Sequence, residues 1–112
     1  MNIWVMTGVF EGEQFATTHF TEKGAMLSGI ADMMDFLGIE DQESALSVFN
    51  DRLDRLIGGE EESIEGVLET DFDKMRSMPM ATIQRLFRDY AEMAWDNDRG
   101  YMLEVVRTQV AA

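Results

Sequence analysis

The chain has 112 residues, of which 22 are Asp or Glu and nine are Lys or Arg, so its formal net charge is −13. With 46% hydrophobic residues it can bury a core, so the acidity does not indicate disorder. The lack of cysteine excludes disulfides and thiolate chemistry, and the negative charge argues against direct binding to nucleic acids or anionic lipids.

The same composition indicates a compartment. A chain without cysteine suits a reducing cytosol, and no apolar run approaches the roughly 18 residues of a membrane span. Residues 1–4 (Met-Asn-Ile-Trp) lack the charged and apolar regions of a signal peptide. We therefore expect a single cytoplasmic domain over residues 1–112.

Residues 2–20 are predicted to form a β-hairpin. Apolar residues fill the segment from Ile3 to Phe10, and the second arm, from Gln14 to Phe20, is rich in Thr and Phe, which favour strands. Glu11-Gly12 stands between the two arms, where Gly can adopt the positive φ that a tight turn requires.

Two helices are predicted after the hairpin. The first lies between Thr21, a suitable N-cap, and Gly38, a suitable stop. The second begins near Asp41 and ends at Gly58-Gly59. Apolar residues at helical spacing mark their buried stripes: Met26, Leu27, Ile30, Met33, Met34 and Leu37 in the first, and Ala45, Leu46, Phe49, Leu53, Leu56 and Ile57 in the second.

Two further helices are predicted before the last strand. The third begins near residues 60–63, with Thr70 as a second cap if the helix breaks there. Pro79 suits the first turn of the fourth helix. The inner residues are Ile64, Val67, Leu68, Phe72 and Met75 in the third, and Met80, Ile83, Leu86, Phe87, Tyr90, Met93 and Ala94 in the fourth.

Residues 96–100 are predicted to form a turn, and residues 101–110 a strand with β-branched Val105 and Val106. The element order is then two strands, four helices and one strand. This order predicts an α+β fold: a three-stranded antiparallel sheet, made of the N-terminal hairpin and the C-terminal strand, packed against about four helices. The last strand is expected beside the first.

No residue pattern indicates catalysis or a cofactor. His19 is the single histidine, with no Ser or Cys at a recognisable spacing, and fits an ordinary polar residue on an exposed strand face. The aspartates from Asp96 onward do not form a calcium loop, because Tyr101 and Arg107 stand where such a loop needs Gly and Glu. We expect no enzyme, metal or cofactor, although a carboxylate-based hydrolase stays open as an alternative.

Methionine and tryptophan permit two interpretations. The ten methionines, clustered at Met33-Met34 and between Met75 and Met80, can fill a core or line an adaptable contact surface. Trp4 and Trp95 fit half-buried positions better than binding anchors. A Met-rich and aromatic surface would suit an oligomerising adaptor subunit, and a homodimer is left open.

The acidic residues are concentrated in two runs without Lys or Arg. Residues 24–51 contain six carboxylates and residues 56–73 contain seven. Like charges four residues apart on a helix cost about 0.2–0.5 kcal/mol per pair. Runs without Lys or Arg therefore indicate that a requirement other than stability acts on the sequence. On one helix Glu61, Glu65, Glu69 and Asp73 would form a ridge, and Asp32 and Asp35 would lie on the outer side of the first helix.

Small, acidic, cysteine-free α+β chains of this size resemble the counter-defence proteins of phages and plasmids, namely anti-restriction DNA mimics and anti-CRISPR proteins. The resemblance covers the size, charge and character of the whole chain and includes no diagnostic motif. It implies that the carboxylates stand in for phosphates in the groove of a nuclease or guide complex, inside a bacterial host cell.

The sequence therefore predicts a non-enzymatic inhibitor of a basic nucleic-acid-processing protein. An immunity protein or antitoxin that neutralises a basic toxin would use the same charge complementarity, and this alternative stays open. The residues expected to bind the partner are Glu60, Glu61, Glu62, Glu65, Glu69, Asp71 and Asp73, with a secondary patch of Asp32, Asp35, Glu40, Asp41 and Glu43.

Overall fold

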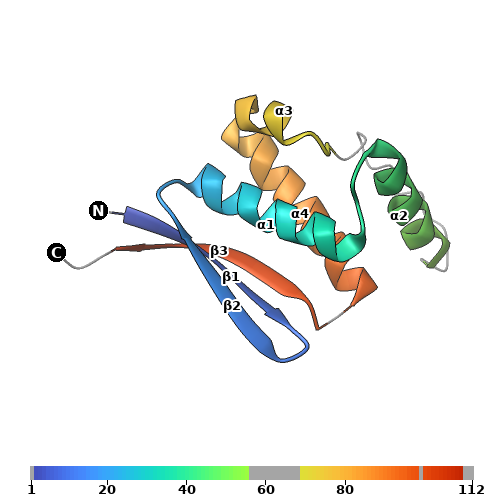
Figure 1. The fold of residues 1–112 in the computed structure, drawn as a ribbon, viewed down its shortest axis with the longest axis horizontal. Coiled ribbons are helices and arrows are strands. Elements are labelled where there is room, and N and C mark those ends of the chain that lie inside the picture. The colour runs from blue at the N-terminus through green and yellow to red at the C-terminus, as the bar shows by residue number, and fades with distance from the viewer. Residues whose placement is uncertain (1, 56–68, 99, 110–112) are drawn as a thin grey trace.

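The computed structural model describes residues 2–55, 69–98 and 100–109 (Figure 1). Three antiparallel strands, β1 (Asn2–Phe10), β2 (Glu13–His19) and β3 (Met102–Gln109), form one sheet in the order β2-β1-β3. Asn2 lies opposite Gln109, so the strand that ends the described chain runs beside the strand that begins it. The predicted α+β fold and strand order are confirmed.

The hairpin is closed by a turn of two residues. Glu11 and Gly12 both have positive φ, 50° and 83°, which is the backbone of a type I′ turn. This turn places Phe10 opposite Glu13 and fixes the register along to Trp4 opposite His19. The twist of a type I′ turn matches the twist of the paired strands, so the turn and the strands favour each other.

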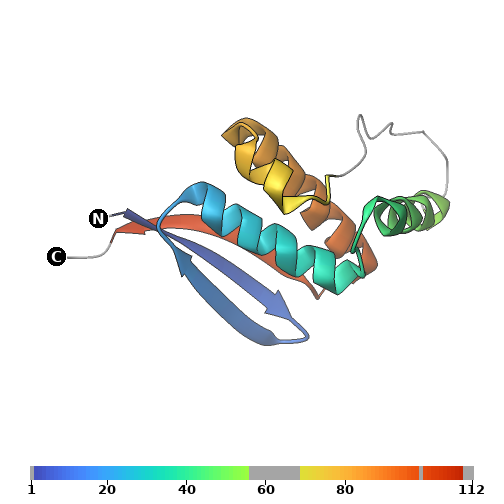
Figure 2. The same cartoon turned by 45° about the horizontal axis from the view of Figure 1, so that its top comes forward.

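Four helices lie on one side of the sheet, as Figures 1 and 2 show: α1 (Glu22–Leu37), α2 (Gln42–Arg55), α3 (Phe72–Ser77) and α4 (Met80–Asn97). Thr21 caps α1 by accepting a hydrogen bond from the Gly24 amide, and Gly38 ends α1 in the left-handed conformation, both as predicted. Within the described part of the chain, no helix combines the length and apolar character that crossing a membrane requires.

The core lies between the sheet, α1 and α4. Gly29 of α1 is buried against Phe87 of α4 and Met6 of β1, because a glycine lets the three elements approach closely. Methionine fills much of the remaining space, as the core interpretation of these residues predicts. The fully buried large side chains are Met6, Ile30, Met33, Met75, Ile83, Tyr90 and Met93.

The structure corrects three details. Leu46 was expected in the buried stripe of α2, but its side chain is 46% exposed. The break in the third helical segment falls one residue later than Thr70, since Asp71 is the N-cap of α3. Pro79 occupies the N-cap position of α4 and therefore lies before its first turn. The segment predicted to be helical over residues 60–68 lies outside the described residues.

Helices α1 and α4 cover one face of the sheet, and no described helix covers the other. Alternate residues of each strand turn to this open face, where Val5 lies opposite Val106 and Val9 opposite Met102. Met102 and Val106 are 57% and 44% exposed. The protein therefore has a two-layer arrangement with an uncovered sheet surface.

Candidate functional site

The first acidic patch begins on α1. Asp32 is half-buried and accepts a hydrogen bond from the hydroxyl of Tyr101, whose ring stacks on Phe36 with centroids 4.1 Å apart. Burial and the nearby carboxylates of Asp32 and Asp35 raise the pKa of Tyr101 above its ordinary value. Asp32 thus supports the core and does not lie on the outer side as predicted, whereas Asp35 is exposed.

The rest of this patch surrounds the start of α2. Asp41 accepts hydrogen bonds from the amide and the hydroxyl of Ser44, both at 2.9 Å, and the Ser44 oxygen accepts from the amide of Asp41 at 3.0 Å. This reciprocal arrangement is a capping box. The hydrogen bonds from Ser44 lower the pKa of Asp41, which keeps this carboxylate ionised. Glu40 and Glu43 beside it are exposed.

The second acidic patch is described in part. Glu60, Glu61, Glu62 and Glu65 lie outside the described residues. Glu69 accepts a hydrogen bond from the amide of Asp71 at 3.1 Å, and Asp71 caps α3 by accepting from the amide of Asp73 at 2.9 Å. Asp73 pairs with Arg76 at 2.6 Å on the surface of α3.

These positions overturn the predicted helical ridge from Glu61 to Asp73. Residues 69–71 are not helical, and Asp73 belongs to the first turn of a new helix. The reason is local: the side chains of Glu69 and Asp71 bind backbone amides. For Asp this is a common alternative to helical hydrogen bonding.

Described residues of the two acidic runs meet in space. Asp41 from the first run and Glu69 and Asp71 from the second line one hollow of about 780 Å³, together with Gln42, Leu46, Thr70 and Lys74. The amide of Gln42 donates to the Thr70 hydroxyl at 3.3 Å and so joins the two segments. We call this feature the acidic hollow. Its described lining carries three carboxylates and one amine, so it attracts cations and basic side chains.

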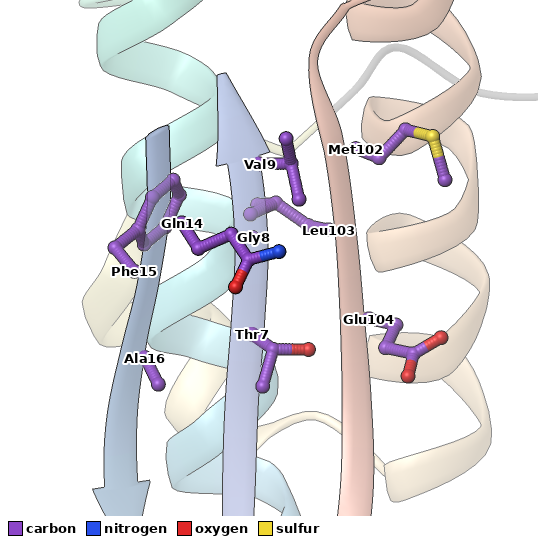
Figure 3. Close-up of a pocket in the computed structure, with 9 residues that line it drawn as sticks. All are labelled: Thr7, Gly8, Val9, Gln14, Phe15, Ala16, Met102, Leu103 and Glu104. Carbon is purple, nitrogen blue, oxygen red and sulfur yellow. The ribbon is translucent and has the colours of Figure 1, made fainter. Parts of the chain in front are cut away.

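A second hollow, of about 510 Å³, lies on the sheet (Figure 3). Its open-face side chains come from all three strands, and among them only Glu104 is charged. The floor is formed at Gly8, where a β-carbon would lie 2.3 Å from both Phe15 and Leu103. The lining residues are Thr7, Gly8, Val9, Gln14, Phe15, Ala16, Met102, Leu103 and Glu104.

The residues considered for catalysis have local roles. Nε2 of His19 lies 2.8 Å from the hydroxyl of Thr17 on the same strand, and Asp98 accepts from the amide of Gly100 in the turn before β3. Among the described residues, no group of three or more His, Asp or Glu side chains is placed to hold a metal ion. The arrangement offers charge and shape for binding, centred on the acidic hollow.

Comparison with known proteins finds no match to a protein-family model, a curated protein or a solved structure.

Proposed function

We propose that the protein is a non-enzymatic inhibitor that binds a basic nucleic-acid-processing protein, such as a restriction enzyme or CRISPR effector, and blocks its nucleic-acid site. The observation that carries this proposal is the meeting of two base-free acidic runs at one hollow in a chain with a net charge of −13. A groove that holds DNA or RNA is already arranged for spaced negative charge, so such a surface fits it. The proposed place of action is the cytoplasm of a bacterial host.

The way the carboxylates are held supports the proposal. Asp41 and Asp71 are each bound to backbone amides at the start of a helix, and Glu69 is bound to the amide of Asp71. A carboxylate has about four acceptor positions, so each retains capacity for a guanidinium or ammonium group. Because these charges are already positioned, little side-chain entropy is lost when a partner binds.

Glu40 and Glu43 extend the same surface, and both are exposed beside Asp41. Lys74 is the one base among the described residues of the hollow, whereas the surface of α4 mixes Arg85 and Arg88 with Asp89 and Glu92. The acidic hollow is thus a patch of net negative charge, whereas the surface of α4 carries both signs. Such an asymmetric distribution of charge orients an approaching basic partner and raises its association rate.

The experiment uses a partner captured from bacterial lysate on the immobilised protein and identified by mass spectrometry. The variant D41N/E69Q/D71N removes three charges while every side chain keeps an oxygen that accepts a hydrogen bond, and Asn caps helices as well as Asp does. We expect the dissociation constant for this partner to rise about 10-fold to 100-fold, chiefly through slower association. The partner should also lose its own DNA or RNA when the wild-type protein binds.

The matched control is D89N/E92Q/E104Q, which makes the same change in net charge on other surfaces and should alter the affinity less than about threefold. Raising NaCl from 50 to 500 mM shortens the Debye length from about 14 to about 4 Å, so association should slow steeply. An association rate that is the same at both salt concentrations would contradict phosphate mimicry. A captured toxin that binds no nucleic acid would replace the proposal with an immunity protein.

A further inference from the structure

The outer edge of β2 is an unprotected strand edge. β2 lies at one side of the sheet, and no other described strand lies beyond it (Figures 1 and 2). From Gln14 to Thr18 the strand has no charge, proline or glycine. Natural edge strands usually carry charged side chains, proline or a bulge, because exposed backbone groups otherwise recruit another strand. The edge of β2 is therefore suited to strand pairing.

The turn determines which backbone groups this edge presents. Residues opposite each other in an antiparallel pair alternate between hydrogen-bonded and non-hydrogen-bonded pairs, and a two-residue turn begins with a hydrogen-bonded pair, here Phe10 and Glu13. The odd-numbered residues of β2 consequently bind β1. The amides and carbonyls of Gln14, Ala16 and Thr18 point outward.

We propose that two copies of this chain pair through β2, antiparallel and centred on Ala16, to form a continuous six-stranded sheet from two three-stranded ones. This register uses every outward backbone group, because Ala16 meets Ala16 of the second copy and Gln14 meets Thr18. The proposal does not depend on the acidic hollow, which lies at α2 and α3.

The distribution of charged residues along β2 favours a second copy as the occupant of this edge. Pairing about Ala16 sets Glu13 of each copy opposite His19 of the other, which brings an acid beside the single histidine of the chain at two symmetric places. Five uncharged residues lie between the two places, so the strongly acidic copies meet where their repulsion is smallest.

The exposure of neighbouring side chains agrees with this register. Phe20 directly follows β2 and is 82% exposed, the most exposed large apolar side chain among the described residues. If the register is extended by one residue, Phe20 faces Gly12 of the second copy, which has no side chain and open space around it. Glu13 and Thr17 are exposed on the helix side of β2, so the helices leave room for a second sheet.

The test is the mass of the protein in solution, measured by sedimentation at about 0.3 M NaCl to screen the repulsion. We expect a dimer of twice the 12.8 kDa chain, with a dissociation constant on the order of 10–100 µM because the contact is small. A16P removes an outward amide and leaves the hydrogen bonds to β1 intact, and edge strands tolerate proline at such a position. This variant should abolish the dimer. The control R107P removes an outward amide from the opposite edge and should leave the dimer intact.

A second pair of variants keeps the test decisive if a proline disturbs folding, which circular dichroism reports. E13K and H19E should each weaken the dimer about threefold to tenfold, and combining them should restore it, since the double variant sets an amine opposite a carboxylate. A chain that stays monomeric up to about 1 mM overturns the proposal. So does a dimer that R107P breaks and A16P does not, or one in which the two charge changes fail to compensate.

Discussion

Single side chains decide several features of this fold, and Glu11 is an instructive one. Its φ of 50° is the one positive value among the described residues other than glycine, at a position where type I′ turns prefer Asn, Asp or Gly. Glutamate lacks the short polar side chain with which Asn and Asp favour the left-handed conformation. The turn forms in spite of this residue, which means that strand pairing and core packing hold it.

Replacing Glu11 with Asn should therefore stabilise the protein by about 0.5–1 kcal/mol, since the left-handed strain is relieved. Urea unfolding at neutral pH measures the change. E11Q is the control, because it removes the same charge without improving the turn. Equal gains from E11N and E11Q would mean that the relief of acidic repulsion, and not the backbone, is responsible.

Two tyrosines give the protein a pH dependence above neutrality. Burial raises the pKa of Tyr90, whose hydroxyl donates to the carbonyl of Glu69 at 2.8 Å, and burial together with Asp32 raises the pKa of Tyr101. Above about pH 10 the unfolded tyrosines lose protons that the folded ones keep. The folded state then binds more protons, so the contribution of the two tyrosines to stability is constant below pH 10 and falls above it.

Each tyrosine should contribute about 1.4 kcal/mol per pH unit to this loss. Urea melts between pH 8 and 11.5 would show it, compared with Y90F and Y101F. Each variant should be less stable at pH 8, because it lacks a hydrogen bond worth about 1–2 kcal/mol, yet should lose stability less steeply above pH 10. Parallel profiles for the wild type and both variants would show that the tyrosines do not cause the alkaline loss.

At the scale of elements, the contact of α1 with α4 and the sheet depends on a missing side chain. A β-carbon on Gly29 would lie 2.5 Å from Cε2 of Phe87 and 3.4 Å from Cγ of Met6. Alanine in place of glycine inside a helix normally stabilises by about 1 kcal/mol. Here the clash should outweigh that gain, because overpacking a core costs about 1–3 kcal/mol.

We expect G29A to lower the free energy of unfolding, measured by urea melts. In the double variant G29A/F87L the smaller leucine makes room for the added methyl group. Its loss of stability should therefore be smaller than the sum of the losses in the two single variants. F87A alone should cost about 3–5 kcal/mol, as removal of a buried aromatic ring does. A gain in stability from G29A would show that α1 and α4 can move apart without penalty.

At the scale of the whole molecule, the net charge of −13 works against the folded state. Few basic side chains relieve it: Lys23 donates its hydrogen bonds to the carbonyls of Arg76 and Met78 at the end of α3, not to a carboxylate. Salt should thus stabilise this protein by screening repulsion.

The melting temperature should rise by about 5–10 °C between 0.02 and 0.5 M NaCl, since 1 kcal/mol corresponds to about 4–8 °C in a domain of this size. Differential scanning calorimetry measures it. The variant D41N/E69Q/D71N serves as the control and should respond less to salt. A melting temperature independent of salt would mean that the acidic side chains are too far apart to repel one another in the folded state.

The molecule also shows what can be predicted from its sequence and what cannot. The turn at Glu11-Gly12 and the ends of α1 at Thr21 and Gly38 were predicted because local backbone chemistry determines them. Leu46 was misplaced because helical spacing identifies a stripe without showing whether anything covers it. Prediction succeeded where neighbours in the chain set the conformation.

For the candidate site, the sequence could predict the negative charge but not its position in the fold. The hydrogen bond from Tyr101 to Asp32 joins residues 69 apart, and Gln42 reaches Thr70 across 28, so neither contact has a signal in local spacing. Sequence counting identified the two acidic runs but not their meeting point. It also did not distinguish the acids that have additional structural roles, which are Asp32, Asp41 and Asp71.

The pairing of Asn2 with Gln109 has a mechanical consequence. Both ends of the described chain lie at the same end of the sheet, as Figure 1 shows, on neighbouring antiparallel strands. A force that pulls residues 2 and 109 apart therefore acts along the hydrogen bonds between β1 and β3 and opens them one after another, as a zipper opens. The protein should give way to such tension at low force, although the same bonds would resist together if the strands were sheared lengthwise.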